Sequence, residues 1–146
     1  MFNLKSKAMK RIFTLTISFL LASVFLTSCI RETIYENNDN YWLSKEMGEV
    51  VYSDPYCNYY VVETFNGYNI VRTYGGYKPY EGSIVYGNFS AAGTRDFYNR
   101  SSGIVYTGTV TDYWLSYVDA QYALDYYCPV GKGATREFKK AVSLKK

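Results

Sequence analysis

Cysteine, tyrosine and the lack of histidine define the chemistry open to this chain. Its 146 residues include three Cys, 18 Tyr and no His. Without an imidazole, the chain cannot form a Ser-His-Asp triad, a Cys-His pair or a histidine-ligated zinc site. The pair Cys57 and Cys128 supplies too few typical metal ligands. We therefore expect neither a metal nor another cofactor.

A β-hairpin around Asn66-Gly67 carries the candidate ligand surface. Residues 58–65 and 68–74 read as strands on either side of this dipeptide, and Asn-Gly tolerates the positive φ angles of a two-residue type I′ turn. In that register Phe65 lies opposite Tyr68, and one face collects aromatic rings around a carboxylate and a guanidinium. The residues of this candidate ligand surface are Tyr59, Glu63, Phe65, Tyr68, Arg72 and Tyr74.

Two interpretations of this surface remain open. Aromatic rings stack on sugar rings, and a carboxylate beside a guanidinium can hydrogen-bond sugar hydroxyls, so the surface would suit a glycan. Alternatively, the tyrosines are half-buried sheet residues, because Tyr favours strands. In that case Glu63 and Arg72, as diagonal neighbours, form an exposed ion pair worth about 0–1 kcal/mol.

Paired carboxylates would be the chemistry of a glycoside hydrolase. Such a pair would have to come from Glu63, Glu81, Asp96 and Asp112. No spacing singles out two of them, and carboxylates near strand ends are ordinary. We therefore expect that the protein is not an enzyme.

The first 28 residues have the pattern of a secretory signal peptide. Residues 1–11 carry four basic residues and no acid, and an apolar run diluted by Ser and Thr occupies residues 12–25. A basic segment followed by a short apolar run is typical of export signals. The run is short for a membrane span of about 20 residues, so the sequence predicts export.

The apolar run ends in Leu26-Thr27-Ser28-Cys29. This motif resembles the lipobox of bacterial lipoproteins, in which an apolar residue and two small residues precede a cysteine. The resemblance implies cleavage by signal peptidase II, a thioether-linked diacylglycerol on Cys29 and an N-terminus acylated by a fatty acid such as palmitate. Ile30, rather than Asp, follows the cysteine, which implies the outer membrane. The alternative is an ordinary signal peptide with an incidental cysteine.

The charge of the mature chain argues against nucleic acid as a partner. Residues 29–146 hold twelve Lys and Arg against thirteen Asp and Glu, which gives no electrostatic basis for binding a phosphate backbone. The C-terminal residues 132–146 have a net charge of +5. They are either a basic arm that touches anionic lipid or polysaccharide or a flexible terminus, and we expect the flexible terminus.

Export would place Cys57 and Cys128 in a compartment where a disulfide persists. A bridge between them would close a loop of about 70 residues and stabilise the fold by about 4 kcal/mol in the chain-entropy view. Two unpaired, buried thiols are the alternative.

The strand and turn pattern predicts a mainly β fold. We expect a small antiparallel β-barrel or sandwich with one short C-terminal helix at residues 117–127. The strand order and the spacing of Gly82, Val85 and Gly87 resemble an OB-like barrel. The expected organisation is a signal peptide at 1–28, a lipidated tether at 29–40, a compact β-rich domain at 41–130 and a basic, flexible tail at 131–146.

Together these features predict a membrane-anchored lipoprotein of the bacterial cell envelope with a non-catalytic binding or assembly role. Its partners would be the membrane, through the lipid, and a glycan or an envelope protein. The alternative is a lipoprotein that inhibits a hydrolase such as lysozyme, as small exported β-barrel proteins with a disulfide do. An inhibitor would present a protruding loop, and residues 75–80, with Tyr77 and Tyr80, are the candidate loop.

Overall fold

The computed structural model describes residues 39–129 and 137–144. The predicted signal peptide, Cys29 and most of the predicted tether lie outside the described residues. The elements follow the order α2 (Asp39–Leu43), β1 (Glu46–Ser53), β2 (Tyr59–Thr64), β3 (Gly67–Thr73), β4 (Ile84–Gly87), β5 (Gly93–Asn99), β6 (Ile104–Leu115) and α3 (Tyr117–Tyr127). Helix α2 was not predicted, and it begins within the expected tether.

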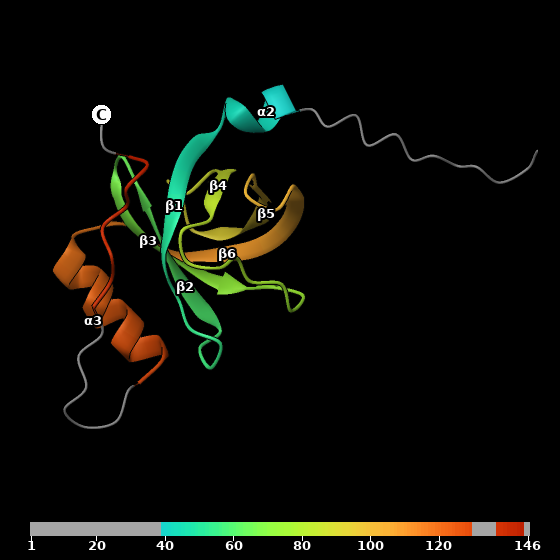
Figure 1. The fold of residues 1–146 in the computed structure, drawn as a ribbon. Helices are drawn as coiled ribbons and strands as arrows, with labels where there is room; N and C mark the ends of the chain where they lie inside the picture. The colour runs from blue at the N-terminus through green and yellow to red at the C-terminus, as the bar shows by residue number, and fades with distance from the viewer. Residues whose placement is uncertain (1–38, 130–136, 145–146) are drawn as a thin grey trace, which may run out of the picture. The chain divides into compact units, whose positions relative to one another are not determined.

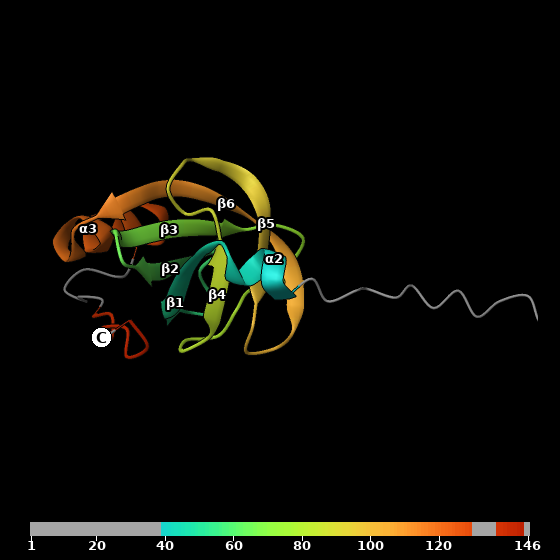
Figure 2. The same ribbon diagram turned by 90° about the horizontal axis from the view of Figure 1, so that it is seen from above.

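The six strands form a closed antiparallel barrel in the order β1-β2-β3-β6-β5-β4 (Figures 1 and 2). Strands β1 to β3 and β4 to β6 are two meanders, and the pairs β3–β6 and β1–β4 join them into a ring. The predicted mainly β fold with a small antiparallel barrel is confirmed. Its six strands distinguish it from the OB-fold, which is a partly open barrel of five.

The barrel interior is a packed hydrophobic core. Side chains alternate between the two faces of each strand, so every strand sends residues inward. The rings of Phe89 and Phe97 stack with 4.9 Å between their centroids, and Gly87 gives Phe97 its space, because a Cβ there would overlap the ring. The buried residues of this core are Val50, Tyr60, Val62, Val71, Val85, Phe89, Phe97, Tyr106 and Val110.

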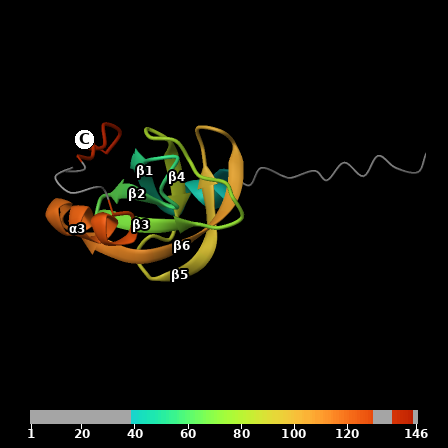
Figure 3. The ribbon, with the colours of Figure 1, turned by 90° about the horizontal axis from the view of Figure 1, so that it is seen from below.

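A second core lies on the outer face of β1, β2 and β3. Helix α3 and the segment 137–144 lie on this side of the barrel, as Figures 1 and 3 show. Leu124 of α3 and Phe138 of the C-terminal segment are buried in one cluster with Val61 and Ile70. Two layers of apolar contacts therefore hold the domain together, one inside the barrel and one outside it.

Helix α3 has the predicted bounds of 117–127. Its N-cap is Ser116, whose hydroxyl oxygen accepts the backbone N–H of Asp119 at 3.2 Å. The same hydroxyl donates to the Asp119 carboxylate at 2.7 Å. The cap satisfies the Asp119 N–H, one of the groups that a helix start otherwise leaves without partners, and the second bond fixes the Ser116 hydroxyl in place.

The expectation of a flexible tail from residue 131 is wrong for residues 137–144. Phe138 and Ala141 are only 6% and 3% exposed. Lys139 and Lys140 between them point to solvent. The segment contains both buried apolar residues and exposed basic residues. Its positive charge alone therefore did not show that it packs against the barrel. The compact domain therefore extends beyond residue 130.

The β2–β3 hairpin turns at Phe65-Asn66, because Thr64 pairs with Gly67 and Glu63 with Tyr68. The predicted pairing of Phe65 with Tyr68 is wrong, and the true register is shifted by two residues. A shift of two keeps every side chain on its predicted face.

Polar side chains explain this turn. The hydroxyl oxygen of Thr64 accepts the backbone N–H of Asn66 at 3.3 Å. The buried amide of Asn69 donates to the Thr64 hydroxyl and to the carbonyl of Gly67. Gly67 has a φ of +129°, whereas Asn66 does not have a positive φ, so the turn is not the predicted type I′.

Candidate functional site

The chain itself covers much of the candidate ligand surface on the β2–β3 hairpin. Tyr59 stacks on Tyr127 of α3 with 4.4 Å between ring centroids. Tyr68 is 8% exposed and packs edge-on against Tyr117 and at a tilt against Phe138. These two tyrosines are part of the second core, as the alternative interpretation of the surface expected.

Glu63, the carboxylate of that surface, binds the C-terminal segment. Its Oε2 accepts the backbone N–H of Ala141 at 2.6 Å. Glu49 lies directly opposite on β1, and its Oε2 accepts the N–H groups of Val142 and Ser143, each at 2.9 Å, and the Ser143 hydroxyl at 2.6 Å. Burial alone would raise the pKa of Glu49, but these hydrogen bonds lower it below its ordinary value.

The other three residues of the surface are exposed but lie apart. Phe65, 89% exposed, sits at the β2–β3 turn, whereas Arg72 and Tyr74 lie at the opposite end of β3. Arg72 pairs with Tyr59 of β2. Tyr59 precedes Glu63 by four residues on that strand, so Arg72 and Glu63 are about 13 Å apart along the strand direction. The predicted diagonal ion pair of Glu63 and Arg72 is therefore wrong, and the six residues do not form one continuous surface.

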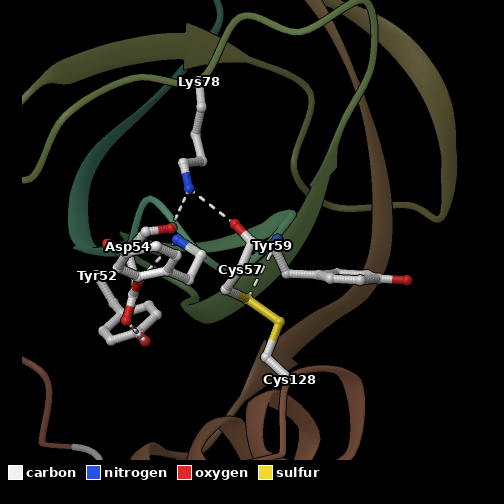
Figure 4. The surroundings of a disulfide bond; sticks show 7 residues. Tyr52, Asp54, Cys57, Tyr59, Lys78 and Cys128 are labelled. Carbon is white, nitrogen blue, oxygen red and sulfur yellow. Dashed lines mark hydrogen bonds between the residues drawn. A yellow bond between two sulfur atoms is a disulfide. The ribbon is translucent and has the colours of Figure 1, made fainter.

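The predicted disulfide between Cys57 and Cys128 is present, with 5.8 Å between the Cα atoms. It joins the loop after β1 to the end of α3 (Figure 4). Lys78 reaches across the same loop, where its Nζ donates to the carbonyl of Cys57 at 2.7 Å and to that of Asp54. Burial lowers the pKa of Lys78. The arrangement fixes this end of the barrel.

The candidate inhibitory loop, residues 75–80, is only partly available to a partner. The Tyr77 ring packs against Tyr106, with 5.0 Å between centroids, and its hydroxyl bonds to Asn99 and Ser102. Tyr80 is 83% exposed. One of the two tyrosines thus closes the end of the barrel, and only the other faces solvent.

Each carboxylate considered for catalysis accepts a hydrogen bond from another group of the protein. Glu81 accepts the backbone N–H of Ser53 at 3.1 Å, and Asp96 accepts the hydroxyl of Thr107 at 2.6 Å. Asp112 accepts a hydrogen bond from the hydroxyl of Tyr127, while its Oδ2 is buried without a hydrogen-bond partner among the described residues. Each of these side chains, like Glu63, has a partner within the fold.

A hollow of about 500 Å³ lies at the opposite end of the barrel from the disulfide, beside α2. Its lining combines two aromatic rings with one amide and three charged side chains, so it is more polar than most small-molecule sites and suits a polar ligand. The lining residues are Tyr41, Trp42, Lys45, Gly87, Asn88, Arg95 and Asp96.

Aromatic and polar contacts hold α2 in place. The ring of Trp42 stacks on Tyr98 of β5, with 6.1 Å between centroids and 28° between planes. The Tyr98 hydroxyl donates to the Asp39 carboxylate, and burial together with that carboxylate raises the pKa of Tyr98. Lys45 places its Nζ 4.4 Å from the centroid of the Tyr41 ring, a cation–π contact.

The chain's second tryptophan, Trp114, lies at the same end of the barrel and is 55% exposed. It has a φ of +57°, and within the described ranges it is the one non-glycine residue with a positive φ. Its backbone N–H donates to the buried Asn69 amide oxygen at 3.2 Å, and its indole N–H donates to the Ser90 hydroxyl at 3.1 Å. A costly backbone conformation held by a buried side chain, here Asn69, is a common feature of functional sites.

A short network joins Trp114 to the hollow. The Ser90 hydroxyl donates to Glu46 at 2.9 Å, and the Ser90 N–H donates to the side chain of Asn88 at 3.1 Å. Because Asn88 lines the hollow, the two tryptophans are connected through the loop between β4 and β5. We call the hollow together with Trp114 the tryptophan site.

The sequence interpretation missed the tryptophan site. Trp42 lies just beyond the predicted tether, and Trp114 lies just before the predicted helix, so neither belongs to an element that marked it as part of a site. The signal available was the rarity of the residue, because the chain has two Trp in all and large rings outside a strand pattern often mark a surface. Their meeting at one barrel end depends on the closed topology.

Comparison with family models, with curated proteins and with solved structures found no match for this chain. In residues 39–129 and 137–144, no group of three or more Cys, Asp or Glu side chains is arranged to hold a metal ion. Over the same described ranges, neither helix is long and apolar enough to span a membrane.

Proposed function

We propose that this protein is a lipid-anchored, non-catalytic binding module of the bacterial cell envelope, and that its ligand is a glycan held at the tryptophan site. The anchor is Cys29, preceded by Leu26-Thr27-Ser28 and a signal-like run. The observation that carries the binding role is the position of both tryptophans, each beside polar groups, at one end of the barrel.

The choice of a glycan follows from the chemistry of this site. A sugar ring presents flat C–H faces and a rim of hydroxyls, so it suits an aromatic platform beside amides and charges. Trp42 and Tyr41 supply the platform, and Asn88, Arg95 and Asp96 supply donors and acceptors. Such a pairing of aromatic rings with a few placed polar groups gives a small-molecule site both affinity and orientation.

The proposed anchor would keep the site close to the bilayer. The described domain begins at Asp39, in α2, ten residues after Cys29. A fully extended chain of that length spans at most about 35 Å. Acyl chains on Cys29 would contribute about 0.8 kcal/mol of membrane affinity for each buried methylene, so the domain would need no membrane-binding face of its own. Ile30 after the cysteine favours the outer membrane.

Glycan binding by the purified full chain tests the proposal. Wild type and a Trp42→Ala variant would be titrated with envelope oligosaccharides, and Tyr122→Ala is the matched control because Tyr122 is 71% exposed on α3. We expect binding by wild type and Tyr122→Ala, and at least a tenfold loss for Trp42→Ala when its circular dichroism is unchanged. If no oligosaccharide binds while crosslinking captures an envelope protein, the glycan proposal is wrong.

The anchor has its own test. Wild type should partition with detergent when a detergent solution separates into two phases, and its N-terminal peptide should begin at Cys29 and carry the mass of the lipid. A Cys29→Ala variant should carry no lipid and should retain residues 1–28. A wild-type N-terminal peptide without added lipid mass at Cys29 would contradict lipidation there, while leaving the binding experiment unaffected.

A further inference from the structure

The charges of the domain are unevenly placed around the tryptophan site. Between residues 39 and 129 the sequence has ten acidic and five basic residues. Two of those five basic residues, Lys45 and Arg95, line the hollow, against one acid, Asp96. The lining of the hollow therefore has a net charge of +1 in a domain that is otherwise acidic, and a positively charged cleft attracts anions. Glu46, next to Lys45, is not part of the lining, and its carboxylate accepts hydrogen bonds from Asn66, Ser90 and the Phe89 N–H.

Neither of these cations is neutralised by a carboxylate in the part of the chain that the structure describes. The guanidinium of Arg95 donates to two carbonyl oxygens, those of Asn88 at 3.3 Å and Ala92 at 2.7 Å. The Nζ of Lys45 lies over the Tyr41 ring. Asp96, the acid that follows Arg95 in sequence, accepts a hydrogen bond from the Thr107 hydroxyl.

The Arg95 guanidinium makes two hydrogen bonds but is incompletely satisfied. Its side chain is half-buried, and its Nε is buried without a hydrogen-bond partner among the described residues. A partly desolvated guanidinium without a counter-ion is unfavourable, and an anion beside it forms charge-assisted hydrogen bonds that are about twice as strong as neutral ones. The site therefore gains more from a negatively charged ligand than from a neutral one.

We infer that the ligand of the tryptophan site is an anionic saccharide, with its carboxylate or phosphate beside Lys45 and Arg95 and its sugar ring against Trp42 and Tyr41. This inference rests on the proposed glycan-binding function and specifies its substrate class. The same chemistry occurs in soluble or wall polysaccharides and in the headgroups of membrane glycolipids. The experiment therefore uses a probe for each source.

The test compares matched acidic and neutral sugars. The soluble pair is trigalacturonate and its methyl ester, titrated into the full chain by calorimetry at low and moderate salt. The lipid pair is detergent micelles that contain either a glucuronosyl diacylglycerol or a glucosyl diacylglycerol. We expect the acidic member of at least one pair to bind at least tenfold more tightly, with a preference that weakens as salt rises.

Variants that remove a charge distinguish the contribution of the cations to binding from that of the aromatic platform. Lys45→Gln and Arg95→Gln should each reduce the ratio of acidic-sugar to neutral-sugar affinity several-fold, because each variant loses a cation while the affinity for the neutral sugar falls less. Trp42→Ala should weaken both. Lys139→Gln is the control, because this lysine is exposed on the C-terminal segment. If Arg95→Gln does not fold, Lys45→Gln, which changes an exposed side chain, still decides the question.

The outcomes distinguish the two proposals. Equal affinity for the acidic and neutral members of both pairs would overturn the inference of an anionic ligand and leave glycan binding intact. A preference that survives Lys45→Gln unchanged would also overturn it. Failure of every sugar to bind would overturn both the inference and the proposed function on which it rests.

Discussion

Inside the barrel, two buried tyrosine hydroxyls are each other's hydrogen-bond partners. The Tyr60 hydroxyl donates to Tyr106 at 3.2 Å, and burial raises the pKa of both side chains above the ordinary value. A buried polar group costs about 1–3 kcal/mol when its partner is removed, whereas removal of both partners can be nearly neutral.

The Tyr106→Phe variant should therefore be destabilised by about 1–3 kcal/mol. The double variant Tyr60→Phe, Tyr106→Phe should be more stable than that single variant, because it leaves no buried hydroxyl without a partner. Urea unfolding gives both free energies. Additive losses in the double variant would show that the two hydroxyls do not act as a pair.

Glu49 makes the packing of the C-terminal segment depend on pH. Its pKa is lowered in the folded protein, so its carboxylate stabilises the fold at pH values above the ordinary value of 4.5. This stabilisation is lost as pH falls below 4.5 and through the lowered pKa. The effect is local, because the acceptor faces the N–H groups of Val142 and Ser143.

Hydrogen exchange would measure this local effect. The amides of Val142 and Ser143 should lose protection below pH 4.5, after correction for the intrinsic pH dependence of exchange. In Glu49→Gln, protection of the same amides should already be reduced at pH 7. Core amides such as that of Val71 serve as the internal reference. Unchanged protection in Glu49→Gln would mean that apolar burial of Phe138 alone holds the segment.

At the scale of elements, the disulfide and α3 act as one unit. Cys57 and Cys128 are separated by 71 residues, and the bridge ties the end of α3 to the loop before β2. In the chain-entropy view, closing such a loop stabilises a protein by about 4 kcal/mol. Loss of the bridge should also let the end of α3 fray.

The double variant Cys57→Ala, Cys128→Ala should lose about 2–5 kcal/mol of unfolding free energy. Reduced wild type should show a similar loss, which separates the effect of the bond from that of the changed side chains. Thermal and urea unfolding are suitable measurements. A loss below about 1 kcal/mol would mean that α3 is held by its apolar contacts with Val61 and Ile70 rather than by the bond.

Helix α3 was predictable from the sequence, whereas the register of the β2–β3 hairpin was not. The bounds of α3 were predictable because Ser116 and Asp119 form a local cap and Cys128-Pro129 ends the helix pattern. The hairpin register was not, since the turn depends on the buried Asn69 amide, which lies outside the turn itself. Residues near an element in sequence determine where it begins and ends, but contacts with residues outside it determine how a strand pairs with its neighbour.

Contacts distant in sequence also determine what covers the candidate ligand surface. Tyr59 and Tyr68 alternate on strands as surface residues would, and nothing local shows that α3 and residues 137–144 cover them. The bond between Glu49 and Ser143 spans 94 residues. The tryptophan site likewise combines α2, the loop between β4 and β5 and the end of β6, which only the closed barrel brings together.

For the whole molecule, stability and proposed binding are placed at opposite ends of the barrel. The disulfide, Lys78 and Tyr77 close one end, and the tryptophan site occupies the other. Structural changes at two distant sites that share no contacting residues usually have additive effects on free energy. Reduction of the disulfide should therefore change sugar affinity by less than twofold at temperatures well below unfolding. A large loss of affinity on reduction would show that the two ends are coupled.

The position of β6 also sets the order in which the molecule can be completed during synthesis. This strand pairs with β3 on one side and β5 on the other, so a chain that has emerged only as far as Asn99 is an open sheet with two unpaired edges. Open edges are templates for aggregation. At about 5–20 residues per second, the stretch from Asn99 to Leu115 takes on the order of one to three seconds to appear. A message truncated within that stretch would make this brief exposure permanent, so its products should accumulate in aggregates rather than as partly folded, soluble chains.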